Sequence, residues 1–335
     1  MKVVVPDFYG SFRCIASACP DTCCAGWEID VDEATLEKYA SARGPLGEKI
    51  RNSISDGHFV LDSAERCPLL DENNLCEIQK ELGENFLSEI CRGHPRFVEV
   101  FGDIREEGLG LCCGESARIL LASNEPLRFV EFSDGEVPET LDGESLEFRD
   151  RVLGFRAEIL SRLSDRTLPL STRLSETLCL VATAEGETVR LSELSPERIW
   201  TGIWSVLSEC ESIGESWDRA KSRAMRFENS RTIFSDADGE RIVAYQIFRY
   251  FAKSLYDGDM LSKAKFAVFF WLLLRRFGVA LAPENSGTVQ KINAIKLLSG
   301  EWEYSDENME ELSKRFASDS FFSTGALLAL VRESG

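Results

Sequence analysis

Cysteines dominate the first third of the chain, and their spacing is suited to metal chemistry. Nine of the eleven cysteines fall at or before position 113. They form three clusters, which are Cys14, Cys19, Cys23 and Cys24 in RCIASACPDTCCAGW; Cys67, Cys76 and Cys91; and the pair Cys112 and Cys113. Thiolates that converge can hold one soft metal centre, because zinc or iron removes the cost of an unpaired buried anion. The pattern therefore predicts a metal site.

The choice of metal depends on how the cysteines are spread. Four thiolates suit either tetrahedral zinc or a [4Fe–4S] cluster. A compact zinc ribbon has two CxxC knuckles, and the sequence has none. The candidate ligands span almost the whole region and number more than four, which favours an iron–sulfur cluster and leaves zinc as the alternative. His94, three residues after Cys91, is a further candidate, although such a histidine more often bonds to nearby backbone.

The elements that must position these cysteines are short. Cys67–Ile78 has two apolar arms around an Asp-Glu-Asn-Asn sequence, which predicts a hairpin-like turn. Residues 96–111 repeat this pattern, with arms joined at Gly102 and Asp103. Asp32 is placed to cap a helix over residues 33–42. We therefore expect residues 1–125 to be an irregular, cysteine-rich metal-binding region with short β-hairpins.

The remainder of the chain has helical periodicity. Apolar residues recur at helical spacing in 146–163, 174–182, 241–256, 261–277, 291–298 and 309–317. Ser195 and Pro196 open a further helix through Leu207, with serine as the cap and proline in the first turn. The sequence thus predicts a mainly α protein in which residues 126–335 form an all-helical bundle.

Composition excludes several classes of function. The formal net charge is −19 and the pI is about 4.7, so the surface repels phosphate backbones and anionic lipids. We expect neither nucleic acid nor a membrane as a partner. Phe266–Leu274 is the most apolar stretch, but spanning a bilayer takes roughly 20 apolar residues, so it is expected to be a buried core helix. No secretory signal is visible, which predicts a cytoplasmic location. The oligomeric state is not fixed by the sequence.

Common enzyme motifs are absent. The stretch GLGLCCG, Gly108 to Gly114, approaches the dinucleotide fingerprint, but Cys113 stands where its third glycine belongs. The chain has no P-loop, no HExxH and no GxSxG sequence. Only His58 and His94 could serve histidine-dependent acid–base catalysis.

Four segments together resemble a known family. The segments FRCIASACPDTCCAGWEIDVD, CPLLDENNLCEI, ICRGHPR and FGDIREEGLGLCC resemble the bacterial flagellin lysine-N-methylases. The same front part is similar to the broader group of zinc- or iron-chelating domains with a CxxCxxCC pattern. The later stretch YQIFRYFAKSLYDGDMLSKAKFAVFFWLL resembles the helical part of the methylases, which argues for the methylase family rather than a free-standing chelating domain.

The resemblance implies an activity and its cofactors. It implies transfer of a methyl group from S-adenosylmethionine to lysine side chains of flagellin, with a [4Fe–4S] cluster required. It also implies the ligand positions, which are Cys14, Cys19, Cys23, Cys24, Cys67, Cys76 and Cys91, to which we add Cys112 of the last pair. The spacing within the first cluster is looser than a strict CxxCxxCC pattern.

The catalytic base stays open, as do two rival functions. A lysine amine must lose its proton before it attacks a methyl group, and its ordinary pKa is about 10.4. The sequence does not choose a base among its carboxylates and tyrosines, which include Glu28, Asp30, Glu106, Tyr245 and Tyr250. The rivals are a protein in which zinc staples the irregular region to the helices, and an iron–sulfur redox module without methyltransferase activity.

Overall fold

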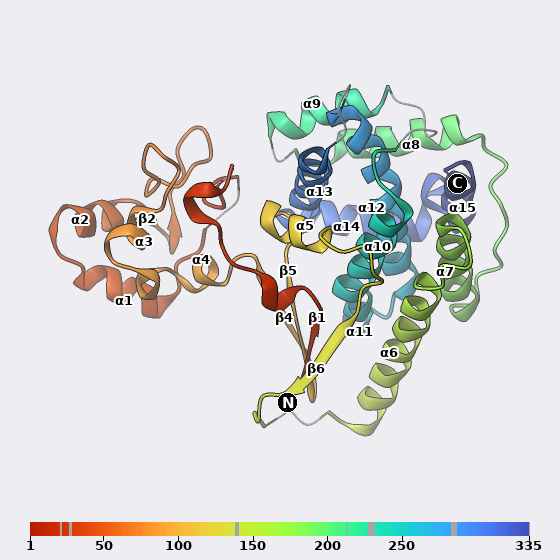
Figure 1. Ribbon diagram of the computed structural model, residues 1–335, viewed down its shortest axis with the longest axis horizontal. Helices are drawn as coiled ribbons and strands as arrows, with labels where there is room; N and C mark the ends of the chain where they lie inside the picture. The colour runs from red at the N-terminus through yellow and green to blue at the C-terminus, as the bar shows by residue number, and fades with distance from the viewer. Residues whose placement is uncertain are drawn as a thin grey trace.

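The structure is a computed structural model that describes residues 1–20, 22–26, 29–137, 141–212, 214–226, 232–282 and 287–334. The fold is mainly α, as predicted, with a small β-sheet at one side of a helical bundle. A small lobe, defined as residues 22–26 and 29–94, lies to one side of both (Figure 1).

A four-stranded sheet joins the first residues of the chain to segments that follow the small lobe in the sequence. Its strands are β1 (Lys2–Pro6), β4 (Arg96–Phe101), β5 (Ile104–Leu109) and β6 (Phe129–Ser133), in the order β4-β5-β1-β6. The hairpin predicted around Gly102 and Asp103 is confirmed, since β4 and β5 are antiparallel and pair up to Phe101 and Ile104. Strand β1 pairs with β5 in parallel and with β6 antiparallel.

Strand β6 corrects the expectation that residues 126–335 are all helical. It lies inside that range and pairs with β1 along its full length. Phe129 faces the bundle, where its ring stacks on Phe248 with centroids 4.6 Å apart. The pairing partner of β6 is more than 120 residues away in the sequence, so the helical periodicity of the later segments gave no indication of it.

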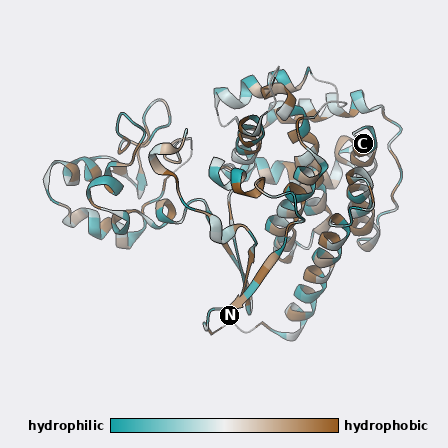
Figure 2. Cartoon of the chain, viewed as in Figure 1, coloured by the Kyte–Doolittle hydropathy of each residue, from teal (hydrophilic) through white to brown (hydrophobic). Residues whose placement is uncertain are grey.

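The helical bundle has one almost wholly buried helix at its centre. Its helices are α5 (Gly114–Leu120), α6 (Gly143–Leu163), α7 (Leu170–Ala184), α8 (Pro196–Glu209), α9 (Glu215–Ala224), α10 (Asp236–Tyr250), α11 (Ser254–Asp257), α12 (Met260–Leu281), α13 (Thr288–Glu303), α14 (Asp306–Ser318) and α15 (Thr324–Glu333). The expected buried helix around Phe266–Leu274 is confirmed in α12. Hydrophobic residues line the inner helices of the bundle (Figure 2). Of the described helices, none is long and apolar enough to cross a membrane.

The small lobe is built from short elements. They are α1 (Glu33–Ser41), α2 (Gly44–Asn52), β2 (Ile54–Ser55), β3 (His58–Phe59), α3 (Glu77–Glu81) and α4 (Glu89–Gly93). Asp32 caps α1 as predicted, with its carboxylate 2.9 Å from the Thr35 amide. The turn predicted in Cys67–Ile78 is confirmed, because Leu70 and Cys76 form an antiparallel bridge around it.

Two separate apolar clusters stabilise the molecule. The small lobe has its own, with Ile29, Tyr39, Ile50 and Phe59 among its buried members. The larger cluster fills the bundle and includes residues from both flanks of the lobe, namely Val4, Phe8, Phe12, Leu109 and Leu111. The chain therefore leaves the main core after residue 12 and returns to it with β4. The domain boundary expected at 125/126 stays a prediction.

Candidate metal centre and the cavity beside it

Five of the cysteines lie close enough together to influence one another electrostatically. They are Cys23, Cys24, Cys67, Cys76 and Cys91, which we call the thiol cluster. They come from four segments of the small lobe that are separated by up to 68 positions in the sequence. Because so many thiols converge from separate segments, the cluster is a candidate soft-metal centre.

Backbone hydrogen bonds fix the segments that carry these thiols. The Cys67 amide donates to the Cys24 carbonyl over 2.8 Å, which joins the first two segments. The Leu70 amide donates to the Cys67 carbonyl and begins the turn that ends at Cys76. Cys91 lies in α4, whose cap Ser88 is fully buried. The local fold therefore positions the thiols without needing contacts between them.

The surroundings of the thiols raise most of their pKa values. Burial raises the pKa of Cys67 to about 11 and that of Cys91 to about 12. The Cys23–Cys24 hydrogen bond lowers the pKa of Cys23 to about 7, and the same bond together with burial raises the pKa of Cys24. Thiols with raised pKa values stay protonated at neutral pH unless a metal ion replaces the proton.

The thiol cluster has more members than a single tetrahedral ion binds. Across the described ranges, no group of three or more His, Cys, Asp or Glu side chains is arranged to hold one metal ion. The thiolates of an iron–sulfur cluster bind different iron atoms, so they need not approach one common point. The thiol donors therefore fit a multinuclear cluster in their chemistry.

The remaining predicted ligands lie in other surroundings. Cys14 is exposed and Cys19 is partly buried. Cys112 has its thiol against Glu303 and Tyr304, whereas its neighbour Cys113 interacts electrostatically with Cys23. Of the last pair, Cys113 is therefore the one shown to interact with the thiol cluster. The complete ligand set stays a prediction.

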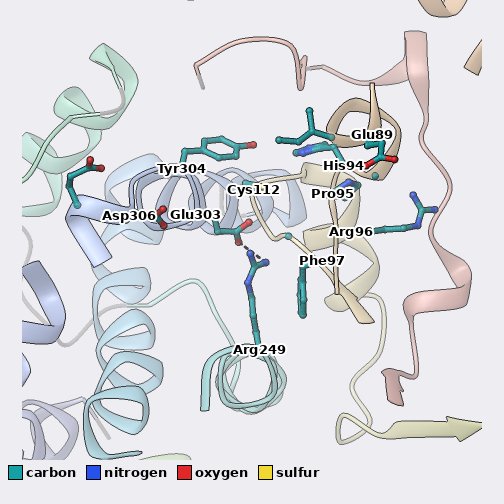
Figure 3. A pocket seen from close by; sticks show the side chains of 14 residues that line it. Glu89, His94, Pro95, Arg96, Phe97, Cys112, Arg249, Glu303, Tyr304 and Asp306 are labelled. Atoms are coloured by element: carbon teal, nitrogen blue, oxygen red, sulfur yellow. Dashed lines mark ion pairs between the residues drawn. The ribbon is translucent and has the colours of Figure 1, made fainter. Parts of the chain in front are cut away.

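A cavity of about 530 Å³ adjoins the thiol cluster. Helix α4, which carries Cys91, lines one side of the cavity (Figure 3). The start of β4, the C-terminal end of α13 and the first turn of α14 line other sides. The lining residues are Glu89, Ile90, Gly93, His94, Pro95, Arg96, Phe97, Gly110, Cys112, Arg249, Glu303, Tyr304, Asp306 and Glu307. A cavity of this size is typical of small-ligand sites.

Glu303 is the most firmly held side chain in the cavity wall. Its side chain is only 5% exposed, and its Oε1 lies 3.2 Å from Nη1 of Arg249. The Leu111 amide donates to the same oxygen over 3.0 Å, and the Ser299 hydroxyl also donates to it. Arg249 in turn lies over the ring of Phe97, 4.5 Å from its centroid. These contacts fix the orientation of the carboxylate.

Neutral groups surround this ion pair. Burial raises the pKa of Cys112, and the charge of Glu303 raises it further, whereas a hydrogen bond with Tyr304 lowers it. Burial and the neighbouring Cys112 both raise the pKa of Tyr304. Burial lowers the pKa of His94, although the charge of Glu303 partly opposes that shift. The imidazole, thiol and phenol are therefore all uncharged near pH 7, which leaves Glu303 and Arg249 as the charged groups inside.

The bases that the sequence left open have structural partners or lie outside the described residues. Glu106 is buried in an ion pair with Arg156, and Asp30 lies 2.7 Å from the His58 ring. The Tyr245 hydroxyl hydrogen-bonds to both backbone groups of Leu109. Glu28 is outside the described residues, as is Trp27.

Sequence reasoning missed Arg249, Glu303 and Tyr304, which belong to helices with no recognisable motif. A signal did exist in the rejected glycine motif. A Cβ at Gly108 would lie 2.8 Å from the Tyr245 hydroxyl, and one at Gly110 would lie 2.6 Å from Oε2 of Glu303. Two glycines in and just after a strand thus indicated that other side chains approach its backbone closely.

Comparison with known proteins gives relatives for part of the chain. It is 36% identical over 137 residues to the flagellar biosynthetic protein FliU of Salmonella muenchen, which is 38% of this chain and 79% of FliU. It is also 36% identical over 137 residues to proteins named Lysine-N-methylase from Salmonella typhimurium and Salmonella choleraesuis. The match spans about a third of the length of these two, 33% of each. No protein-family model and no solved structure matches the chain.

Proposed function

The chain belongs to the family of FliU and the Salmonella Lysine-N-methylases, and from that premise we propose that it is a methyltransferase acting on lysine side chains of flagellin. The observation that carries the proposal is the arrangement of the thiol cluster beside the cavity. Helix α4 carries Cys91 of the thiol cluster, and its residues Glu89, Ile90 and Gly93 line the cavity. A ligand in the cavity would therefore lie next to a metal bound by the thiols.

The metal in this proposal is a [4Fe–4S] cluster, with zinc as the alternative. Three of the five thiols of the thiol cluster, which are Cys23, Cys24, Cys67, Cys76 and Cys91, would hold it. A cluster with three cysteine ligands leaves one iron able to coordinate the amino and carboxylate groups of S-adenosylmethionine. Five thiols converge here, one more than the four ligands of a structural zinc site, which supports the cluster over a single zinc ion.

The chain's own residues would prepare the amine and exclude water. A lysine amine must be uncharged to attack an electrophilic methyl group, so a group beside the amine must take up its proton. Pro95, Phe97 and Tyr304 give the cavity apolar walls. Part of the same proposal is a cytoplasmic location, where reduced thiols persist.

Co-expression with flagellin tests this proposal. We expect methylated lysines in flagellin by mass spectrometry, and their loss in the Cys67→Ala and Cys91→Ala variants. Cys179→Ala is the matched control, because Cys179 lies in α7 of the bundle, away from the small lobe. Protein purified without oxygen should be brown, with a broad visible absorbance, whereas a colourless zinc protein would point to the alternative metal. Methylation that survived both lobe substitutions would contradict the requirement for the cluster.

A further inference from the structure

The mouth of the cavity is lined by three acidic side chains. Glu89, Asp306 and Glu307 line the cavity and are exposed. No ion pair involves any of the three within the part of the chain that the structure describes. Arg96 also lines the cavity, but its guanidinium lies over the Phe12 ring, 5.1 Å from the centroid. The mouth therefore attracts cations.

The interior ends in the Glu303 carboxylate, which also has a side-chain hydrogen bond with Cys112. Arg249, the Leu111 amide and the Ser299 hydroxyl all approach Oε1 of Glu303. Oε2 lies over Gly110, which has no side chain to occupy that space. Because the carboxylate is 95% buried and fixed in orientation, Oε2 can accept a hydrogen bond from a ligand without a large loss of side-chain entropy.

Between the mouth and Glu303 the cavity wall is aromatic. Figure 3 shows the ring of Tyr304 extending across the cavity towards His94, with Phe97 on the strand opposite. Such walls pack well against methylene groups, and an aromatic face also attracts a cation. The wall therefore suits a flexible apolar chain that ends in a positive charge.

We propose that this cavity binds the side chain of the acceptor lysine, with its ε-ammonium donating to Oε2 of Glu303, which takes up the proton before the amine attacks the methyl group. The inference rests on the proposed function and adds the place where the substrate enters. The cofactor is the competing occupant, since it too carries an ammonium group. Its free carboxylate would face Glu89, Asp306 and Glu307 at the mouth, whereas a lysine within a polypeptide has no free carboxylate. The charge of the mouth thus favours the lysine.

Calorimetric titration of the full chain with Nα-acetyl-L-lysine amide tests the inference. The same titration with Nα-acetyl-L-norleucine amide, which lacks the ammonium, should show no binding. The double variant Asp306→Asn, Glu307→Gln should weaken lysine amide binding about fivefold, since both exposed charges attract the ammonium only weakly through solvent. Glu303→Gln should weaken it more than about tenfold. Glu310→Gln, on the same helix outside the cavity, is the matched control and should bind normally.

Each other outcome overturns the inference. Equal binding of the norleucine amide would do so, as would unchanged affinity in the double variant. Each titration is run with and without S-adenosylhomocysteine. The inference would be contradicted if the lysine amide bound under neither condition, or if it competed with S-adenosylhomocysteine for the cavity. Methylation of flagellin is measured in parallel. If flagellin is methylated but the cavity variants bind the lysine amide as the unchanged chain does, only the lysine site is refuted. If the variants weaken lysine amide binding but no flagellin is methylated, only the methyltransferase is refuted.

Discussion

Two glycines around the end of β5 allow side chains from distant helices to reach the cavity. A Cβ at Gly108 would lie 2.3 Å from the Phe97 ring, and one at Gly110 would lie 2.6 Å from Glu303 and 3.1 Å from the Cys112 sulfur. Neither residue has a positive φ, so the requirement for glycine is space rather than backbone conformation. The consequence is that the smallest substitution at either position displaces a neighbour.

Gly110→Ala should therefore disturb Glu303 directly. The added methyl group must push the carboxylate away from its three donors, and overpacking of this kind costs about 1–3 kcal/mol. We expect a lower free energy of unfolding by denaturant titration, together with loss of lysine amide binding. Gly114→Ala is the control, because a Cβ there meets only Ile292 at an ordinary 3.6 Å. Equal stability of the two variants would show that Glu303 tolerates the methyl group.

Tyr245 offers a second test at the residue scale. Its hydroxyl accepts from the Leu109 amide and donates to the Leu109 carbonyl, each over 2.6 Å. Tyr245→Phe leaves both buried backbone groups without this partner, which costs about 1–3 kcal/mol. Tyr256→Phe is the control, since Tyr256 is 67% exposed and should change stability by less than about 0.5 kcal/mol. Thermal unfolding of both variants measures the difference, and similar values would contradict a structural role for the Tyr245 hydroxyl.

At the scale of elements, Asp32 joins two helices of the small lobe. Its carboxylate caps α1 through the Thr35 amide and also accepts from the Glu89 amide at the start of α4, over 2.8 Å. Burial raises the pKa of Asp32, but these hydrogen bonds outweigh that effect and lower it below the usual 3.8. The element that carries Cys91 is thus attached to the first helix of the lobe.

Asp32→Ala should loosen the small lobe by about 1–2 kcal/mol, the usual cost of a lost N-cap. Because the folded pKa is depressed, the stabilisation is present above pH 3.8 and is lost as the pH falls through the folded pKa. Asp142→Ala removes the equivalent cap of α6, where the carboxylate accepts from Ser145 and has no second helix to hold. Hydrogen exchange of the α4 amides should increase only in the Asp32 variant; unchanged exchange would show that α4 is held by other contacts.

Local signals explain which elements the sequence predicted. Asp32, Ser195 and the turn at Gly102 act through neighbours within a few residues, so their helices and hairpin were predictable. The parallel pairing of β1 with β5 joins residues 102 positions apart, and the ion pair of Arg249 with Glu303 joins residues 54 positions apart. Such contacts are chosen by the packing of whole elements, which single-sequence patterns do not encode.

The same limit applies to the candidate site. The cysteines were visible as residue types, and five of them do lie together. Whether Cys112 or Cys113 faces the thiol cluster depends on how the turn before α5 packs against the small lobe. That packing gives Cys113 the interaction with Cys23 and turns Cys112 to Glu303. The cavity could not be predicted at all, because its walls come from four separate regions of the chain.

At the scale of the whole molecule, the two apolar clusters differ greatly in size. The small lobe has few fully buried apolar residues, and one of them is Cys67 itself, whereas the bundle contains the long buried helix α12. Lobes with so small a core usually need a metal or disulfides to stay folded. Metal binding that is coupled to folding would therefore stabilise the lobe rather than the bundle.

Removal of the metal should accordingly unfold one part of the molecule before the other. We expect a chelator, or the pair Cys67→Ser and Cys76→Ser, to produce a separate unfolding transition at lower temperature, while the main transition of the bundle stays in place. Limited proteolysis followed by mass spectrometry should then locate new cleavages within residues 22–94 and none within α10 or α12. Cys179→Ser is the control, because its thiol belongs to α7 and should leave both transitions unchanged. A single transition that shifts as one unit would mean that the lobe depends on its contacts with the bundle, and that the thiol cluster acts on the stability of the whole chain.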